Sequence, residues 1–457
     1  MPDSQGKSVV LYNPISGTGH FDSWCELFAG ALLSTGWRVH IVTPEGTLIE
    51  QRLRQTFPSS HAALTVHDRS SVLRGPIPCE SPFSTLRSAA ISARQRRHRR
   101  RPSGAQGTIM RAARRVLAGL TDLALRVLVF LLRDIDAATH DLFNLRLDIS
   151  NTSPLTFARD VNLVATSARL PASVVLNLYV DLYNADDEEW RRFGASMHRP
   201  WAGLNIDLTN SLPDGLLDAS RTLRALLYIN EDTVCFPVSP VQRLEYAWIP
   251  DVANNDLPEG RTELASEILR RSAGRKIVFL GGAIGGTKNL STWYQAIRLA
   301  DPARWYFIQI GAVNQGTLTT ADRLNLQQML VALPENLLIQ DRFLPDERSF
   351  NELIFISDVV WGLYRDFDRS SNVLGKAAVF RKPIIVSERF LMGKRVRDYR
   401  IGAAIAEDAP EAVVDALDKL STSPVSASCF ERYIQDFGFP ALSRRLDETL
   451  MRVLADD

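Results

Sequence analysis

The sequence is poor in the residues that build disulfide frameworks and metal sites. Its cysteines lie far apart and form no C-x-x-C pair, which predicts reduced, structural thiols. They are Cys25, Cys79, Cys235 and Cys429. All seven histidines occur at or before His198, so the second half offers no imidazole to a metal ion or as a general base. Chemistry in that half must use carboxylates, lysine, arginine, hydroxyls or backbone amides.

The chain also lacks a charge excess and a leader sequence. Its 53 basic and 52 acidic residues leave a net charge of +1, which argues against nucleic acid as a partner. The opening MPDSQGKSVVLYN has neither the charged nor the apolar region of a signal peptide, so we expect a cytoplasmic protein. The 457 residues, 45% of them hydrophobic, predict an ordinary globular protein of two or three domains.

The chain opens with a strand, a glycine-containing loop, a helix and a second strand. The apolar runs at 8–12 and 38–43 predict strands, and the spacing over 21–35 predicts a helix. This β-α-β order is typical of a parallel sheet with right-handed crossovers. Two later runs, 173–183 and 223–229, predict further strands of the same domain.

The first glycine loop, NPISGTGH, is a candidate acceptor site. Glycines between a strand and a helix let a ligand approach the backbone, and the helix start favours an anion or a polar group. The acceptor candidates are Gly17, Gly19 and His20, with Asp181 a weaker one. The loop does not spell G-x-G-x-x-G, so no dinucleotide site is indicated. A plain helix-capping turn, with His20 as an ordinary helix-start residue, remains open.

From Lys276 onward strands and helices alternate clearly. We predict six strands and intervening helices that form a doubly wound domain. The predicted strands cover 276–282, 305–311, 337–340, 358–364, 382–387 and 402–407; the predicted helices cover 290–299, 346–356, 371–380, 391–399 and 409–420. The polar stretch 251–274 is the candidate hinge. We therefore expect an N-terminal domain over 1–250, a C-terminal domain over 251–430, and a last helix over 431–457 that could pack back on the first domain.

One segment of the first half differs from its surroundings, an insertion over about 80–145. It contains a cluster of arginines from Arg94 to Arg101, followed by an apolar helix with one polar stripe over Arg111–Arg133. Its 17 residues from Val116 to Leu132 contain two charges and make a poor transmembrane span. It suits an interfacial helix that binds an anionic membrane surface through Arg94–Arg133. A buried helix with an exposed basic loop is the equal alternative.

Two loops of the second half carry candidate ligand chemistry. Residues Gly281–Lys288, GGAIGGTK, predict a cradle of backbone amides with one cation, which suits a diphosphate. Residues 365–372, RDFDRSSN, precede a helix at the carboxyl end of a strand, where open α/β sheets bind ligands. Asp366 and Asp368 also spell D-x-D, a metal-binding pattern elsewhere, but three residues recur often by chance.

The stretch from Lys276 to about Glu407 resembles the donor-binding half of GT-B glycosyltransferases, especially the large retaining family called GT4 or glycosyltransferase group 1. The resemblance lies in three segments, FLGGAIGGTKNL, DRFLPDERSFNELIFISDVVW and SSNVLGKAAVFRKPIIVSE. It implies an α/β protein with two Rossmann-like doubly wound domains facing a cleft. Lys288 stands at the place of the family's diphosphate-binding lysine.

Two positions depart from the family pattern. Counted back from Pro383, the family's two glutamates fall here on Asp368 and Lys376, and a lysine cannot accept hydrogen bonds from ribose hydroxyls. The family's diphosphate-loop arginine falls on Gly282. We expect Lys376 or Arg369 to supply the missing charge, so that Lys376→Ala abolishes transfer.

The resemblance implies metal-independent transfer of a sugar, with retention, from a UDP- or GDP-sugar to a glycan or lipid-linked acceptor, without a further cofactor. Bacterial surface polysaccharide or glycoconjugate synthesis, peripheral on the inner face of the membrane, fits the basic segment. The candidate catalytic residues are Lys288, Asp368, Lys376 and His20. The candidate donor-binding residues are Gly281, Gly282, Gly286, Lys288, Arg342, Phe343, Ser370, Ser371, Asn372, Val373 and Lys376. A sugar-nucleotide epimerase, a phosphorylase and a catalytically inactive membrane-bound binding protein remain as alternatives.

Overall fold

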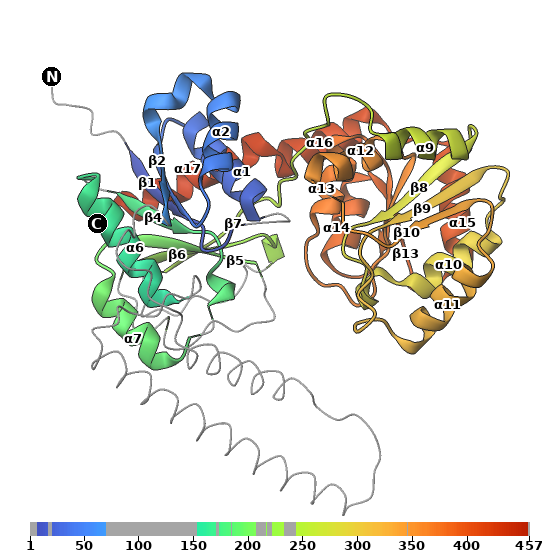
Figure 1. Ribbon diagram of the computed structural model, residues 1–457, viewed down its shortest axis with the longest axis horizontal. Coiled ribbons are helices and arrows are strands. Elements are labelled where there is room, and N and C mark those ends of the chain that lie inside the picture. Colours follow the sequence, from blue (N-terminus) through green and yellow to red (C-terminus); the bar gives the residue numbers. More distant parts are fainter. Residues whose placement is uncertain are drawn as a thin grey trace, which may run out of the picture.

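The computed structural model describes residues 7–16, 21–69, 153–170, 173–183, 185–206, 216, 222–232, 244–344 and 346–455. Within these ranges the chain forms two parallel sheets, each covered by helices on both faces (Figure 1). The prediction of two Rossmann-like doubly wound domains is therefore confirmed. The basic segment Arg94–Arg133 lies outside the described residues. No described helix is both long enough and apolar enough to cross a bilayer.

The first sheet has seven strands in the order β3-β2-β1-β4-β5-β6-β7, all parallel. They are β1 (Ser8–Tyr12), β2 (Arg38–Thr43), β3 (Leu64–Asp68), β4 (Val174–Asn177), β5 (Trp201–Asn205), β6 (Leu223–Tyr228) and β7 (Glu245–Trp248). Alternate residues of β1 enter opposite cores, because successive side chains of a strand point to opposite faces. Burial on both faces explains why these strands read as continuous apolar runs.

Helices from both ends of the chain cover the first sheet. One face packs against α1 (Phe21–Ser34), α2 (Thr47–Thr56) and the last helix, α17 (Phe439–Ala455), and the other against α6 (Pro154–Ser167) and α7 (Asp187–Ser196). Leu442, Leu446 and Leu450 recur at helical spacing and are fully buried with this sheet. In Figure 1 α17 runs from the second domain to the first.

The second sheet has six parallel strands in the order β10-β9-β8-β11-β12-β13. They are β8 (Lys276–Gly281), β9 (Trp305–Ile310), β10 (Leu337–Gln340), β11 (Val359–Gly362), β12 (Ile384–Ser387) and β13 (Gly402–Ile405). The helices are α9 (Glu263–Ser272), α10 (Leu290–Leu299), α11 (Thr320–Val331), α12 (Glu347–Ile356), α13 (Asn372–Val379), α14 (Phe390–Tyr399), α15 (Pro410–Thr422) and α16 (Ala427–Phe437). The strand order reverses direction between β8 and β11.

The structure corrects several predicted elements. The strand predicted over 173–183 ends at Asn177, whose side-chain oxygen accepts a hydrogen bond from the Tyr179 amide and turns the chain into a 3₁₀ helix, η2 (Val180–Leu182). Strands β3, β5 and β7 and helices α2, α6 and α11 were not predicted. Asp186 and Glu189 form a capping box at the start of α7.

Candidate donor-binding site

The candidate site lies where the order of the second sheet reverses. In open parallel sheets, ligands bind outside the carboxyl ends of the two strands that flank this reversal. Here these strands are β8 and β11. β8 ends at Gly281 and leads through a short 3₁₀ helix, η4 (Gly286–Lys288), into α10, whereas β11 leads through residues 363–371 into α13. The topology thus brings together the two loops that the sequence singled out.

The first loop needs glycine for two different reasons. Gly282 has a φ of +89°, a conformation that side-chain-bearing residues rarely adopt. Gly286 faces the backbone of the segment before α11: a Cβ atom there would lie 2.4 Å from the carbonyl oxygen of Thr317. Both positions therefore depend on the absence of a side chain to keep the loop in this shape.

Lys288 is the cation of this loop. Its Nζ donates a 2.6 Å hydrogen bond to the hydroxyl of Tyr364 and lies 4.1 Å from the centre of the same ring. Within the described part of the chain, no carboxylate lies within ion-pair distance of this Nζ. The backbone is fixed as well, because Trp361 Nε1 donates to the Lys288 carbonyl at 3.1 Å. A half-buried ammonium group without an acidic partner is suited to bind an anion.

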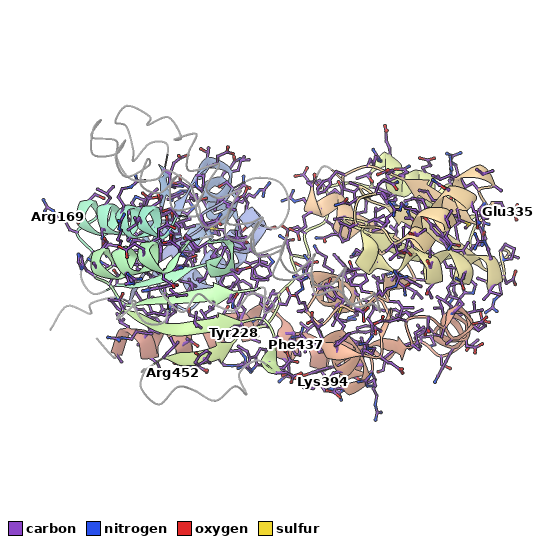
Figure 2. The ribbon with its side chains drawn as sticks, turned by 90° about the horizontal axis from the view of Figure 1, so that it is seen from below. Arg169, Tyr228, Glu335, Lys394, Phe437 and Arg452 are labelled. Carbon is purple, nitrogen blue, oxygen red and sulfur yellow. The ribbon has the colours of Figure 1, made fainter. Side chains whose placement is uncertain are left out.

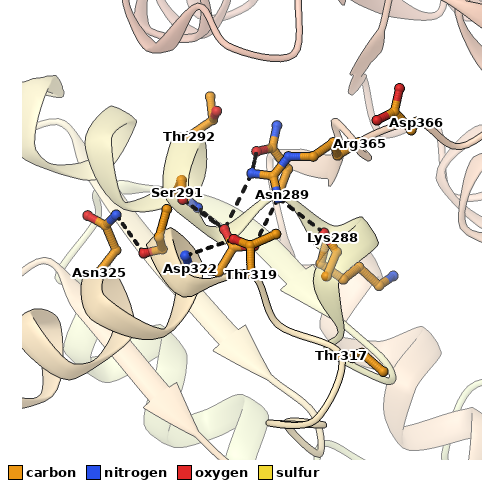
Figure 3. A network of polar contacts seen from close by, with 12 residues as sticks. Lys288, Asn289, Ser291, Thr292, Thr317, Thr319, Asp322, Asn325, Arg365 and Asp366 are labelled. Atoms are coloured by element: carbon orange, nitrogen blue, oxygen red, sulfur yellow. Dashed lines mark hydrogen bonds and ion pairs between the residues drawn. The ribbon is translucent and has the colours of Figure 1, made fainter. Parts of the chain in front are cut away.

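A polar network lies behind the loop (Figure 3). Its centre is Asp322 of α11, a fully buried carboxylate that pairs with Arg365 at 2.9 Å. Burial alone would raise the pKa of Asp322, but the hydrogen bonds from Arg365, Thr319 and Ser291 outweigh it and lower the pKa to about 2. Figure 3 shows the Lys288 side chain extending away from this network. Asp322 and Arg365 were not among the predicted site residues.

The second loop carries exposed charges close to Tyr364. Asp366 has a φ of +47°, its amide donates to Glu407 at 3.1 Å, and its carboxylate pairs with Arg389 at 2.8 Å. Asp368 is exposed, and the Arg369 guanidinium lies 5.8 Å from the ring centre of Phe367. The predicted catalytic carboxylate, Asp368, therefore lies on the same loop as Tyr364, the partner of Lys288.

The predicted donor helix α13 starts beside this loop. Ser371 precedes it, and its side chain makes no capping hydrogen bond, while Asn372 and Val373 form the first turn. Free amides of a helix start can bind an anion. Ser370 differs: its buried hydroxyl donates to Asp251 at 2.7 Å and accepts from Arg395 at 2.8 Å. The structure thus gives Ser370 a place between the two domains.

The structure gives Lys376 protein partners. Lys376 is 1% exposed, and its ammonium group donates to Glu347 at 2.7 Å, to Asn351, and to the carbonyl of Asn254 at 3.3 Å. Burial lowers its pKa, against the effect of Glu347. These three acceptors use all three protons of the Lys376 ammonium group. None of them is a partner of Lys288. The Lys376 side chain thus joins α13 to α12 and to the segment between the domains.

The remaining predicted residues lie at two other places. Arg342 and Phe343 follow β10; Phe343 is 62% exposed, and Arg342 Nε donates to Gln340 at 2.9 Å. In the first domain Asp181 belongs to η2 and accepts a long hydrogen bond from the Ile206 amide at 3.5 Å. Gly17, Gly19 and His20 lie outside the described residues.

The sequence contains local signals for Asp322 and Arg365, two residues of the polar network that were not predicted. Thr319 and Asp322 spell T-x-x-D, a capping-box spacing that marks a helix start. Arg365 directly follows the run DVVWGLY, at the carboxyl end of a predicted strand. That Asp322 and Arg365 lie in contact follows from the strand order of the second sheet, which the sequence pattern alone does not provide.

Comparison with solved structures gives the class of fold. Over 99% of its length the chain matches all of a glycosyltransferase from Rickettsia africae, with a TM-score of 0.58 and 9% identity. It matches all of the sucrose-phosphate synthase from Thermosynechococcus elongatus over 99% of its length (TM-score 0.56, 12% identity). It also matches all of the HepE protein of Anabaena, solved with UDP and glucose, over 98% of its length (TM-score 0.54, 11% identity). These are GT-B proteins, so the predicted GT-B fold is confirmed.

The sequence comparisons give no match. No protein-family model matches the chain, and no curated protein matches it. The similarity to the three solved structures is thus one of fold, at identities near one residue in ten.

Proposed function

We propose that the protein is a glycosyltransferase that takes its sugar from a nucleotide-sugar donor bound between β8 and β11. The observation that carries this proposal is Lys288: a cation that has no carboxylate partner among the described residues, on a glycine loop at the reversal point of a GT-B second domain. The glycine cradle and the start of α13 supply backbone donors for a diphosphate. The names of two fold neighbours, HepE with UDP and a UDP-forming synthase from Burkholderia vietnamiensis, favour a UDP-sugar over a GDP-sugar.

In the proposed reaction, the positive charge of Lys288 acts on the leaving nucleoside diphosphate. The bond between the anomeric carbon and the β-phosphate oxygen breaks, an acceptor hydroxyl oxygen bonds to that carbon, and negative charge grows on the diphosphate, which takes up the proton of the acceptor hydroxyl. Lys288 and the loop amides stabilise this charge. We propose that the exposed Asp368 accepts hydrogen bonds from sugar hydroxyls and that the exposed Phe343 stacks on a base.

The finer parts of the proposal rest on the sequence. We propose retention of configuration, no metal or further cofactor, and a glycan or lipid-linked acceptor in bacterial surface polysaccharide or glycoconjugate synthesis. Binding to the inner face of the membrane through Arg94–Arg133 is supported by the basic residues of that segment. Acceptor binding by Gly17, Gly19, His20 and Asp181 is proposed from the sequence, because glycines between a strand and a helix let a ligand approach the backbone.

The proposal is tested by nucleotide binding to a lysine variant. UDP or GDP should raise the melting temperature of the wild type, and Lys288→Ala should weaken the binding of the same nucleotide about 10- to 100-fold, measured by calorimetry. Lys419→Ala removes an exposed lysine from α15 and should bind like the wild type. A wild type that responds to neither nucleotide would refute the proposal. Conversion of a UDP-sugar to its epimer without an acceptor would instead show an epimerase.

A further inference from the structure

We propose that Arg365 and Asp322 form the positioning pair of the diphosphate loop: Asp322 fixes the guanidinium, and the guanidinium fixes the loop backbone that carries Lys288. This inference rests on the proposed function for its effect on the nucleotide. The geometry that it describes belongs to the protein without a ligand.

The carboxylate of Asp322 is anchored on both oxygens. Oδ1 accepts from the Ser291 amide and from the Ser291 hydroxyl, each at 2.8 Å, and Oδ2 accepts from the Thr319 hydroxyl at 2.7 Å. Ser291 belongs to the first turn of α10 and Thr319 precedes α11. Asp322 thus ties the starts of two helices together, and its remaining contacts go to Arg365 at 2.9 and 3.4 Å.

Arg365 reaches the loop at three successive places. Its Nη2 donates to the Asn289 side-chain oxygen at 2.7 Å, its backbone amide donates to the Thr287 carbonyl at 2.8 Å, and its Nη1 lies 3.5 Å from the Gly286 carbonyl. These residues directly surround Lys288. The planar fork of a guanidinium can serve the carboxylate and the loop oxygens at the same time, which a lysine ammonium cannot do with the same geometry.

Asn289 needs such support because its backbone is strained. It has a φ of +56°, in the left-handed region, at the start of α10. Its side chain is held from two sides, by Arg365 and by the Glu407 carbonyl, to which its Nδ2 donates at 2.6 Å. The conformation directly after Lys288 is therefore set by contacts from the β11 and β13 loops.

The charge balance distinguishes a positioning role from ligand binding. The guanidinium of Arg365 is neutralised by a fully buried carboxylate, whereas Lys288 pairs with a neutral hydroxyl. We therefore infer that Lys288 contacts the diphosphate and that Arg365 acts through the loop.

Two variants and one control test the inference in the full-length protein. Arg365→Lys keeps the charge and removes the fork, and Asp322→Asn removes the anchor. Glu352→Gln is the matched control, because Glu352 is also a buried carboxylate that accepts from a helix-capping threonine, Thr262, but at α9. Hydrogen–deuterium exchange of the loop amides is measured without nucleotide, and UDP and GDP binding by calorimetry.

We expect faster amide exchange over residues 282–291 in Arg365→Lys, and about tenfold weaker binding of whichever nucleotide the wild type binds. Glu352→Gln should lose thermal stability while keeping the exchange of this loop and the nucleotide affinity. Wild-type loop exchange in Arg365→Lys would overturn the inference, even if Asp322→Asn fails to fold. If loop exchange rises but the wild type binds neither UDP nor GDP, the positioning pair stands and the proposed function fails.

Discussion

Individual glycines decide whether the diphosphate loop keeps its shape. At Gly286 the nearest atom to an added Cβ is a backbone carbonyl oxygen, 2.4 Å away, which cannot rotate aside as a side chain would. Overpacking of this kind costs about 1–3 kcal/mol. The segment around Thr317 would have to shift, and the loop amides would shift with it. The diphosphate loop and the segment around Thr317 therefore cannot move independently of each other.

We predict that Gly286→Ala weakens UDP or GDP binding about tenfold or more and lowers the free energy of unfolding by about 1–3 kcal/mol. Calorimetry and urea unfolding measure the two effects. Gly260→Ala is the control, because an added Cβ there meets no atom within 4 Å. It should keep the affinity and change stability by less than about 1 kcal/mol. Equal affinity in both variants would contradict the proposed place of the diphosphate.

At the scale of elements, the pairing of β2 with β3 brings together two histidines. His40 Nδ1 lies 3.3 Å from His67 Nε2, and the two rings stack. Burial, with smaller contributions from His67 and Arg38, lowers the pKa of His40 to about 4. Burial lowers the pKa of His67 as well. Both rings are therefore neutral at pH 7.

We predict that this strand pair makes the protein sensitive to acid. The folded-state pKa of His40 is below the usual 6.5. The contribution of the neutral His40 to the free energy of unfolding is therefore complete above pH 6.5, and up to about 3 kcal/mol is lost as the pH falls towards 4. His40→Gln should be less stable at pH 7 but lose less stability between pH 6.5 and 4, as measured by urea unfolding. The exposed His61 provides the control, and His61→Gln should follow the wild type. An equally steep loss in His40→Gln would contradict the assignment.

The strands and helices of the second sheet show how much could be predicted from the sequence. The alternation after Lys276 placed all six strands and most helices of the second sheet because their apolar residues recur cleanly. It missed α11, which buries Leu326 and Met329 but leaves Leu324 and Val331 exposed, so that no apolar stripe is visible. Lys288 could be found because its glycine loop is contiguous. The Asp322–Arg365 pair spans 43 residues, and only the strand order brings it together.

At the scale of the whole molecule, the two domains meet through buried charge. Arg395 of α14 is 1% exposed and pairs with Glu231 of the first domain at 2.5 Å. It also donates to the Ile229 carbonyl at 3.0 Å and to Ser370, directly before α13, at 2.8 Å, and lies 4.3 Å from the Phe437 ring centre. In Figure 2 Lys394 and Phe437 lie where the two domains meet. The start of the proposed donor helix is thus tied to the first domain.

The path of the chain adds a second connection. After the second sheet is complete, α16 packs on α13, and α17 returns to lie along α1. Trp37 Nε1 donates to Asp447 of α17 at 2.7 Å, within a core that α17 completes for the first sheet. The C-terminal helix is therefore part of the first domain in space, and the chain crosses between the two domains twice. The angle between them depends on contacts such as that of Arg395 rather than on a single flexible linker.

We predict that Arg395→Ala loosens the two domains without unfolding either. Removing one partner of a buried pair leaves the other charge unpaired and costs about 3–5 kcal/mol, and here that cost falls on the contact between the domains. Small-angle scattering should show a larger radius of gyration, and calorimetry should resolve two thermal transitions where the wild type shows fewer. UDP or GDP should still bind within about threefold of the wild-type affinity, because Lys288 and its loop belong to the second domain alone. Arg304→Ala, which breaks an exposed pair with Asp418 inside the second domain, should leave the scattering unchanged. An unchanged radius of gyration in Arg395→Ala would mean that the two crossings of the chain hold the domains together without the Arg395 contacts.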